Sequence, residues 1–531
     1  MTETYAVIGA SLAGARAVET LRAEGFDGRI VLIGAEHHLP YDRPPLSKEV
    51  ITGRKQPHET LIHPARFYSD NDIELLLGTR ATRIDTATRT VELDSGAALT
   101  VDKLLLCTGT APRRPDIAGL QLDGVHFLRT MEDSIAIRDR LAHGGSLVVV
   151  GGGLIGMELA AAAVALGAAV TVLERDSGVL RRVLGEQVGD RLARWHADRG
   201  VCIRTGAEVE RIEGDHRVRR VCTTDGFTAE ADVVVIGIGV APATGLADDC
   251  GIAIGNGVIV DEYCRSSVPG IYAAGDIAEH PDHLLRESIR LEHWQNAQNQ
   301  AIAAARSMAG NARPYREVPW FWSDQGDTNI QVAGHPRSGD RTVWRGDPES
   351  LEFSAFHLRD GQLVGAVSVN RRRDVRLAMP LISQRTRPEP ALLADPSVDL
   401  RSVVDGTAPA PTPVAVRRKT EMTTTKKSEN LVRVCAIAEL SPGNVTRVDT
   451  QPPIAVYNID GEFYATADWC SHDKSSLADE GFIEDGQIEC GWHFAKFCIK
   501  TGAVTAPPAS TPLRTYAVEV HDDAIYVAVP D

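Results

Sequence analysis

Short apolar runs alternate with glycine-rich turns and helix-like segments along the first part of the chain. Tyr5–Ile8 predicts a buried strand, and the turn after it leads into a helix that ends near Ala23. Residues 29–33 predict the next strand, and residues 146–150 begin a second copy of the same strand, turn and helix pattern. Strands that alternate with helices in this way favour an α/β fold.

The longest apolar stretch, residues 159–173, is interrupted by Gly167 and Thr171. A membrane-spanning helix needs about 20 apolar residues, so we read this stretch as a helix, a turn and a strand. The chain begins directly with an apolar strand, which leaves no room for a secretory signal. We therefore expect neither a membrane partner nor export.

A change of composition divides the chain at residues 407–430. Proline-rich sequence gives way there to a basic segment rich in threonine and lysine, which has too few apolar residues to fold. We expect a linker, with a separate domain after it. Met422 heads a segment that looks like the start of an independent protein, which indicates a fusion, natural or engineered.

Composition narrows the function classes further. A chain of 531 residues predicts about three or four domains, and its net charge of −16 gives no support to nucleic-acid binding. Its nine cysteines show no disulfide-like spacing, so a reducing cytoplasm fits best.

The turn after the first strand carries a pattern typical of dinucleotide binding. Gly9, Ser11 and Gly14 form a Gly-x-Ser-x-x-Gly sequence, and Glu36 follows the next strand, where a carboxylate accepts ribose hydroxyls. Serine at the second position still lets the backbone approach a pyrophosphate if its φ is negative. By itself this pattern is weak support for a nucleotide site.

The second copy is more complete. Gly151, Gly153 and Gly156 give the full Gly-x-Gly-x-x-Gly, and Glu174 ends the following strand. An acid at that point favours NADH, because it binds the adenosine 2′-hydroxyl and repels a 2′-phosphate. Arg175, the next residue, could accept a 2′-phosphate and keeps NADPH open as the alternative. Two dinucleotide sites in one chain indicate a bound flavin and an exchanging nicotinamide nucleotide.

Two further motifs, near the C-terminus, predict an iron–sulfur site: Cys470-Ser471-His472 and Cys490-Gly491-Trp492-His493. Each offers one thiolate and one imidazole, so Cys470 and Cys490 would bind one iron of a Rieske [2Fe–2S] cluster, and His472 and His493 the other. A structural Cys2His2 zinc site is the alternative, but its cysteines are usually paired and its histidines follow as a second pair.

The residues around these ligands resemble a Rieske ferredoxin that serves a ring-hydroxylating dioxygenase. Ser475, Trp492 and Ala495 stand where high-potential members carry the cysteines of a disulfide and a serine. Fewer hydrogen bonds to the cluster predict a potential toward the low end of the range of about −150 to +300 mV.

The first 405 residues resemble the FAD-dependent ferredoxin reductases of oxygenase systems. Glycine-marked segments at Thr108-Gly109, Gly239 and Gly275-Asp276 support the resemblance, and residues 40–48 replace the redox-active cysteine pair of disulfide reductases. No cysteine precedes Cys107, so we expect no thiol chemistry at the flavin. The resemblance places Glu158 by the nicotinamide and Trp322 beside the flavin, with core packing as the alternative for Trp322. It implies an FAD site lined by Arg43, Lys48, Ala81, Arg129, Asp276 and Trp294.

The resemblances together imply an α/β flavoprotein with FAD and NAD Rossmann-like domains and an α+β C-terminal domain, followed by an all-β Rieske domain. The expected boundaries are 1–109 and 236–318 for FAD, 110–235 for NAD, 319–406 for the reductase C-terminal domain, 407–430 for the linker and 431–531 for the Rieske domain. We expect a monomer or a weak homodimer.

The implied activity is that of an NADH:ferredoxin oxidoreductase fused to its ferredoxin. Electrons would pass from NADH to FAD and to the [2Fe–2S] cluster, and then to a terminal ring-hydroxylating oxygenase in aromatic hydrocarbon catabolism. The cofactors carry this chemistry, so no catalytic acid, base or nucleophile is expected. One rival is a redox-sensing flavoprotein similar to apoptosis-inducing factor, although its Rieske module is N-terminal. A nitrite reductase component is disfavoured, because no siroheme-binding cysteines are evident.

Overall fold

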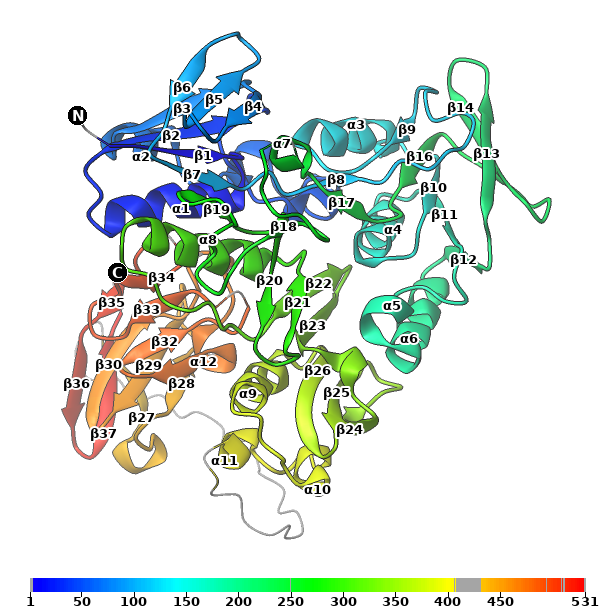
Figure 1. The fold of residues 1–531 in the computed structure, drawn as a ribbon. Helices are drawn as coiled ribbons and strands as arrows, with labels where there is room; N and C mark the ends of the chain where they lie inside the picture. The colour runs from blue at the N-terminus through cyan, green and yellow to red at the C-terminus, as the bar shows by residue number, and fades with distance from the viewer. Residues whose placement is uncertain are drawn as a thin grey trace. The chain divides into compact units, whose positions relative to one another are not determined.

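The computed structural model describes residues 3–248, 250–404, 406, 431–492, 494–507, 509 and 511–529 (Figure 1). It separates into two compact units. The first comprises residues 1–370, 378–396 and 400–405, and the second comprises residues 371–377, 397–399 and 406–531. The predicted linker, 407–430, lies outside the described residues.

A five-stranded parallel sheet forms the N-terminal part of the first unit, in the order β3-β2-β1-β7-β19. β2 and β3 lie on one side of β1, and β7 and β19, which follow later in the sequence, lie on the other. The strand order therefore reverses between β1 and β7, where this fold opens a crevice. Helices α1 (Leu12–Ala23) and α8 (Trp294–Met308) lie against each other through buried alanines. The strands are β1 (Thr4–Ile8), β2 (Arg29–Gly34), β3 (Ile73–Leu77), β7 (Lys103–Leu106) and β19 (Ile271–Ala273).

Smaller elements complete this part of the first unit. Two three-stranded sheets flank the parallel one: β4-β5-β6 and β18-β20-β21. The bounds are β4 (Ala81–Asp85), β5 (Thr90–Leu93), β6 (Ala98–Thr100), β18 (Val258–Ile259), β20 (Ala278–Asp282), β21 (Glu287–Arg290), α2 (Ala65–Asp70), α7 (Gly245–Asp248), η1 (Pro44–Ser47) and η2 (Pro57–Thr60).

A second parallel sheet has the order β12-β11-β10-β16-β9 and a reversal between β10 and β16. The predicted helix, turn and strand over residues 159–173 are confirmed: α4 ends at Ala165, Gly167 has a φ of +80°, and β11 begins at Ala169. Bounds are β9 (Val125–His126), β10 (Ser146–Val150), β11 (Ala169–Glu174), β12 (Val201–Thr205), β13 (Val209–Gly214), β14 (Val218–Thr223), β15 (Thr228–Glu230), β16 (Val233–Ile236), α3 (Met131–Leu141), α4 (Leu154–Ala165), α5 (Arg181–Leu184) and α6 (Glu186–Asp198).

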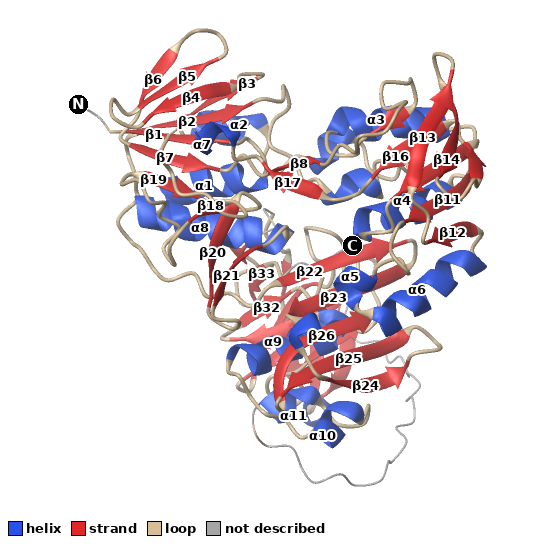
Figure 2. Cartoon of the chain, turned by 45° about the vertical axis from the view of Figure 1, so that its right-hand side comes forward, coloured by secondary structure: helices blue, strands red, loops and turns tan. Residues whose placement is uncertain are grey.

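Two short strands connect the parallel sheets. β8 (Thr110–Pro112) leaves the first sheet and β17 (Val240–Pro242) returns to it, and the two pair in antiparallel fashion. Figure 2 shows this pair between the sheets. The glycine-marked segments at residues 108–109 and 239 lie at the two ends of this pair.

An antiparallel sheet of order β22-β23-β26-β25-β24 forms the last part of the first unit. It shares one hydrophobic core with the second parallel sheet, because Val332 and Val367 join the cluster that contains Met157 and Val149. Bounds are β22 (Trp320–Gln325), β23 (Thr328–Gly334), β24 (Arg341–Asp347), β25 (Glu352–Arg359), β26 (Gln362–Val369), η3 (Pro336–Ser338), α9 (Arg372–Ser383), α10 (Pro390–Ala394) and α11 (Leu400–Val404).

The second unit contains three antiparallel sheets: β27-β37-β36, β28-β29-β30-β35 and β31-β32-β33-β34. The only α-helix among the described residues after 430 is the short α12, so the all-β prediction is confirmed. Bounds are β27 (Leu431–Ala436), β28 (Val445–Val448), β29 (Ile454–Ile459), β30 (Glu462–Ala467), β31 (Phe482–Glu484), β32 (Gln487–Glu489), β33 (Lys496–Cys498), β34 (Val504–Ala506), β35 (Thr515–Tyr516), β36 (Val518–His521), β37 (Ala524–Ala528), α12 (Leu477–Glu480) and η4 (Ile437–Glu439).

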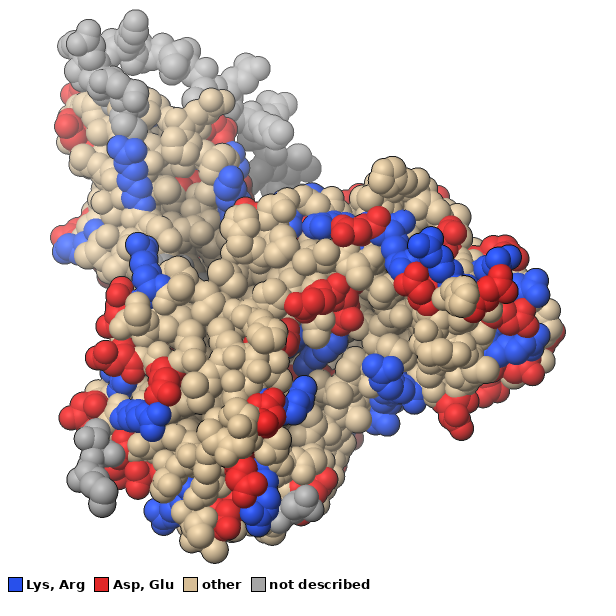
Figure 3. Space-filling view, turned by 90° about the horizontal axis from the view of Figure 1, so that it is seen from above, with Lys and Arg blue, Asp and Glu red and all other residues tan. Residues whose placement is uncertain are grey.

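The surface carries charges of both signs. On the face drawn in Figure 3, acidic and basic side chains are interspersed rather than gathered into one basic patch. Among the described residues, none of the helices combines the length and the apolar character that a bilayer crossing requires.

Candidate functional site

One large cavity, about 1580 Å³ in volume, lies in the first unit at the carboxyl ends of both parallel sheets. The reversal in strand order places a ligand crevice at these edges. Every predicted nucleotide-binding residue except Gly14 lines this cavity: Gly9, Ser11, Glu36, Arg43, Lys48, Ala81, Thr108, Gly109, Arg129, Gly151, Gly153, Gly156, Glu158, Glu174, Gly239, Gly275, Asp276, Trp294 and Trp322.

The first glycine-rich turn is shaped by close backbone contacts. A Cβ added at Gly9, whose φ is +118°, would lie 2.1 Å from the Cys107 carbonyl oxygen. A Cβ at Gly14 would lie 2.0 Å from the Gly9 carbonyl oxygen, so Gly14 lets the helix pack on the strand instead of facing the cavity. Ser11 has a φ of −126°, which meets the condition for a serine at this position.

The second turn repeats this construction. Cβ atoms at Gly151 and Gly156 would lie 2.4 Å from the Gly237 carbonyl oxygen and 2.3 Å from the Gly151 carbonyl oxygen. A Cβ at Gly153, by contrast, would meet nothing within 4 Å, so the backbone at the start of α4 faces open space. A glycine turn that opens at a helix N-terminus suits a pyrophosphate. Both turns therefore fit a dinucleotide.

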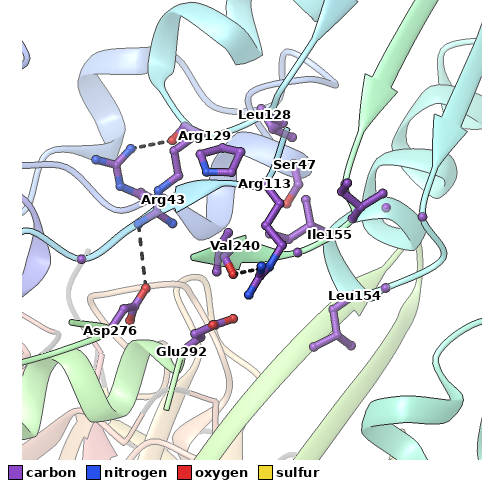
Figure 4. Close-up of a pocket in the computed structure, with 18 of the residues that line it drawn as sticks. Arg43, Ser47, Arg113, Leu128, Arg129, Leu154, Ile155, Val240, Asp276 and Glu292 are labelled. Carbon is purple, nitrogen blue, oxygen red and sulfur yellow. Dashed lines mark hydrogen bonds and ion pairs between the residues drawn. The ribbon is translucent and has the colours of Figure 1, made fainter. Parts of the chain in front are cut away.

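Glu36 is held in place where β2 ends. Its two carboxylate oxygens accept hydrogen bonds from the Arg43 guanidinium at 2.6 Å and the Tyr41 hydroxyl at 2.5 Å. Arg43 also donates to the Arg129 carbonyl oxygen at 2.5 Å (Figure 4). A carboxylate fixed in this way is ready to accept ribose hydroxyls.

Asp276 lies beside Arg129 on the same wall, with 3.8 Å between the carboxylate and the guanidinium (Figure 4). Burial raises the pKa of Asp276, and Arg129 acts against that shift. Nearby, the Trp294 indole N–H donates to Asp42 at 2.8 Å and fixes the first residue of α8 at the cavity edge. These contacts suit the polar chain of a flavin nucleotide.

Glu174 ends β11 and is also held by backbone groups. Gly152 N–H donates to one carboxylate oxygen at 2.6 Å, and Asp176 N–H donates to the other at 2.8 Å. Arg175 and Arg182 line the same cavity, so arginine side chains lie within the site as well. The choice between NADH and NADPH thus remains a prediction based on Glu174.

Lys48 and Glu158 are buried charged residues that line the cavity, and the half-buried Asp324 lies next to them. The Lys48 ammonium lies 3.8 Å from the Glu158 carboxylate and 3.5 Å from Asp324. Burial raises the pKa of Glu158, while Lys48 and the hydroxyls of Ser323 and Ser47 act in the opposite direction. Burial also disfavours the charged form of Lys48, but its two acidic neighbours more than offset this and raise its pKa.

Sequence reasoning missed several residues of this site. Ser47 and Ser323 carry no motif, although a polar residue inside an otherwise aromatic strand is a signal that could have pointed to Ser323. Trp320 is completely buried in the core, whereas Trp322 lines the cavity. Cys107 lines the cavity too, but burial raises the pKa of its thiol well above the usual range, so it stays neutral.

In the second unit, Cys470 and Cys490 lie in two loops with the same hydrogen-bond pattern. The Cys470 amide donates to Ser475 at 2.9 Å and its carbonyl accepts from Lys474 at 2.9 Å. The corresponding bonds of Cys490, to Ala495 and from Phe494, measure 2.8 and 3.0 Å. Both cysteines are 1% exposed. The two predicted motifs therefore begin in loops with the same backbone hydrogen bonds.

The two thiols also face each other. A hydrogen bond to Cys490, followed by burial, raises the pKa of Cys470, and Ser475 Oγ lies 2.9 Å from the Cys490 sulfur. A pair of buried sulfurs fits one iron of a two-iron cluster. Among the described residues, His, Cys, Asp and Glu side chains form no group of three that could hold one metal ion. His472 is described, but His493 lies outside the described residues.

Comparison with known proteins connects these sites to families. Residues 3–301 match the pyridine nucleotide-disulphide oxidoreductase family, residues 320–404 the reductase C-terminal family and residues 430–517 the Rieske [2Fe-2S] domain. The predicted FAD, pyridine nucleotide and [2Fe–2S] cofactors are confirmed by these matches.

Two relatives are ferredoxin–NAD(+) reductase components. That of the anthranilate 1,2-dioxygenase system of Burkholderia cepacia is 40% identical over 404 residues, which are 75% of this chain and 99% of the relative. That of the p-cumate 2,3-dioxygenase system of Pseudomonas putida is 41% identical over 396 residues, 74% of this chain and 97% of the relative.

Among solved structures, the covalent putidaredoxin reductase–putidaredoxin complex matches with 34% identity and a TM-score of 0.74, over 76% of this chain and 99% of that one. About three quarters of this chain covers nearly the whole length of each of these proteins, and the Rieske match occupies residues 430–517. The chain therefore belongs to the pyridine nucleotide-disulphide oxidoreductase family, among its ferredoxin reductases, and carries a Rieske [2Fe–2S] domain as well.

Proposed function

We propose that this protein takes electrons from NADH and delivers them one at a time to a terminal ring-hydroxylating oxygenase that acts on aromatic compounds. The observation that carries the proposal is a single cavity reaching both glycine-rich turns, in a chain that also contains two matching cysteine loops. The relatives named as components of dioxygenase systems support the choice of electron acceptor.

The residues of the first unit have distinct tasks in this function. The turn at Gly9 and the carboxylates of Glu36 and Asp276 would bind the flavin nucleotide, and the turn at Gly151 with Glu174 would bind NADH. The bound flavin supplies the conversion from a two-electron donor to single electrons. Glu158 and Lys48 lie buried on the wall between the two turns, where they can orient the nicotinamide.

The second unit would hold the cluster that accepts these electrons. Cys470 and Cys490 would bind one iron, and His472 with His493 the other. Each histidine belongs to the same short motif as one of the cysteines, so a single folded domain supplies all four ligands.

The test is NADH-driven reduction of cytochrome c by the full-length protein and by its His472→Ala variant, without oxygen. We expect NADH to bleach the flavin in both proteins, because the nucleotide cavity and the cysteine loops belong to different units. Rapid cytochrome c reduction is expected only when the cluster is intact. A flavin that NADH does not reduce in the wild-type protein would contradict the proposed function.

A further inference from the structure

A buried chain of hydrogen bonds leads away from Glu158 into the protein. Ser323 Oγ donates to Glu158 Oε1 at 2.7 Å, and Gln325 Nε2 donates to Ser323 Oγ at 3.2 Å. Gln325 Oε1 in turn lies 2.7 Å from His196 Nε2. His196 is 1% exposed, and Ser323 and Gln325 are completely buried.

The chemistry of the groups gives this chain one direction. The Lys48 ammonium, 3.8 Å away, favours the carboxylate form of Glu158, and a carboxylate only accepts. The Ser323 hydroxyl therefore donates to Glu158 and accepts from the Gln325 amide. The Gln325 oxygen is then the acceptor for His196, which must carry its proton on Nε2. Burial lowers the pKa of His196 to about 4, so the imidazole is neutral at physiological pH. Each donor therefore points toward Glu158.

This series of hydrogen bonds also connects separate parts of the first unit. His196 lies on α6 and Glu158 on α4, whereas Ser323 and Gln325 lie on β22 of the antiparallel sheet. On its other oxygen, Glu158 accepts from Ser47 of η1 at 2.5 Å. The carboxylate, carried by α4, is thus held on both of its oxygens by donors from two further elements, β22 and η1.

We propose that Ser323, Gln325 and His196 are positioning residues that hold the Glu158 carboxylate in the orientation needed for hydride transfer from NADH. This inference rests on the proposed function. A carboxylate at this wall can accept a hydrogen bond from the nicotinamide carboxamide and so determine which way the ring faces. Without Ser323, one carboxylate oxygen loses its fixed donor, and the ring loses its defined orientation.

The experiment measures flavin reduction by saturating NADH in a stopped-flow instrument, with Ser323→Ala, Ser323→Thr and Gln325→Leu in the full-length protein. We expect Ser323→Ala to slow reduction about ten-fold or more, the usual effect of losing a hydrogen bond to a charged group. Ser323→Thr retains the hydroxyl and should recover most of the rate. Gln325→Leu breaks the next link and should slow reduction about three-fold, since Ser323 itself remains.

Ser368→Ala is the matched control, because Ser368 is a fully buried serine on β26 of the same sheet and does not line the cavity. It should leave the rate unchanged. The double variant Ser323→Ala with His196→Leu separates positioning from packing: its loss should be clearly smaller than the product of the single losses, because both act through one chain.

Wild-type rates in both Ser323→Ala and Gln325→Leu would overturn the inference, as would losses in the double variant that simply multiply. If Ser323→Ala fails to bind flavin, Gln325→Leu decides the matter alone. A wild-type flavin that NADH cannot reduce would instead refute the proposed function, whatever the variants show.

Discussion

The preference for NADH over NADPH should depend on the charge of Glu174. Its carboxylate is fixed at the end of β11 by the amides of Gly152 and Asp176, at 2.6 and 2.8 Å, so it cannot turn away from an incoming nucleotide. Glu174→Gln removes the charge and retains both the size of the side chain and an oxygen for the Gly152 amide. The variant therefore isolates the electrostatic contribution.

The size of the effect follows from Coulomb's law. Two unit charges 4 Å apart interact by about 1 kcal/mol in water, and a 2′-phosphate carries about two charges. Repulsion alone then disfavours NADPH by about 2 kcal/mol, a factor of about 30. Arg175 and Arg182 line the same cavity, so their positive charges offset part of the repulsion between Glu174 and the 2′-phosphate. We therefore expect NADH to be preferred about ten-fold or more in kcat/KM.

Steady-state reduction of an artificial acceptor, with each nucleotide in turn, gives the two kcat/KM values. Glu174→Gln should bring their ratio close to one. Glu230→Gln is a suitable control, since Glu230 is an exposed acid that ends β15 and does not line the cavity. A wild-type preference for NADPH, or an unchanged ratio in Glu174→Gln, would mean that Arg175 sets the specificity and that the reasoning is wrong.

Three further results are expected. Replacing His472 with alanine should abolish the Rieske spectrum but leave flavin bound and reducible by NADH, as visible absorption would show. The folded protein holds His196 at a pKa of about 4, below the usual value of about 6.5, so its stability should be complete above about pH 6.5 and decline as the pH falls toward 4. Urea unfolding at pH 7 and pH 5 should show that His196→Leu loses about 2 kcal/mol less than the wild type over this interval. Finally, the region after residue 430 has 15 acids and 6 basic residues in a chain of net charge −16, so both parts are negative, net charge does not bring them together, and their covalent connection must supply proximity. Cluster reduction in the intact protein should then be independent of dilution in stopped-flow traces, and a rate that falls with dilution would show transfer between molecules.

Most of the fold and of the cavity was predictable because their signals are local. The strand before Gly9 and the glycines that follow it are contiguous in sequence, and Gly14 and Gly156 each pack against the first glycine of their own motif. Gly14 is the one predicted nucleotide-binding residue that does not line the cavity. It allows the helix to pack on the strand, and the sequence pattern alone does not distinguish such a glycine from one that faces a ligand.

The buried chain behind Glu158 could not be predicted in the same way. Ser323, Gln325 and His196 belong to segments that meet only after three parts of the chain have packed, and a serine or glutamine carries no distinctive spacing. A polar side chain in an apolar strand signals a buried partner but does not say which one. For the cluster, the ligand motifs were evident in the sequence. The matching hydrogen bonds of the two cysteine loops were not, because a backbone hydrogen bond leaves no mark on residue type.

The core shared by the second parallel sheet and the antiparallel sheet has a consequence for how the protein unfolds and how it can be rebuilt. Since Met157 and Val149 pack in one cluster with Val332 and Val367, these two regions should lose structure in a single cooperative step, and their amides should exchange with solvent together. An engineered reductase that exchanges its nucleotide-binding region alone would cut through that core. A chimera should therefore carry β22 to β26 with the NAD-binding region, so that the boundary of exchange follows the packing rather than the sequence motifs.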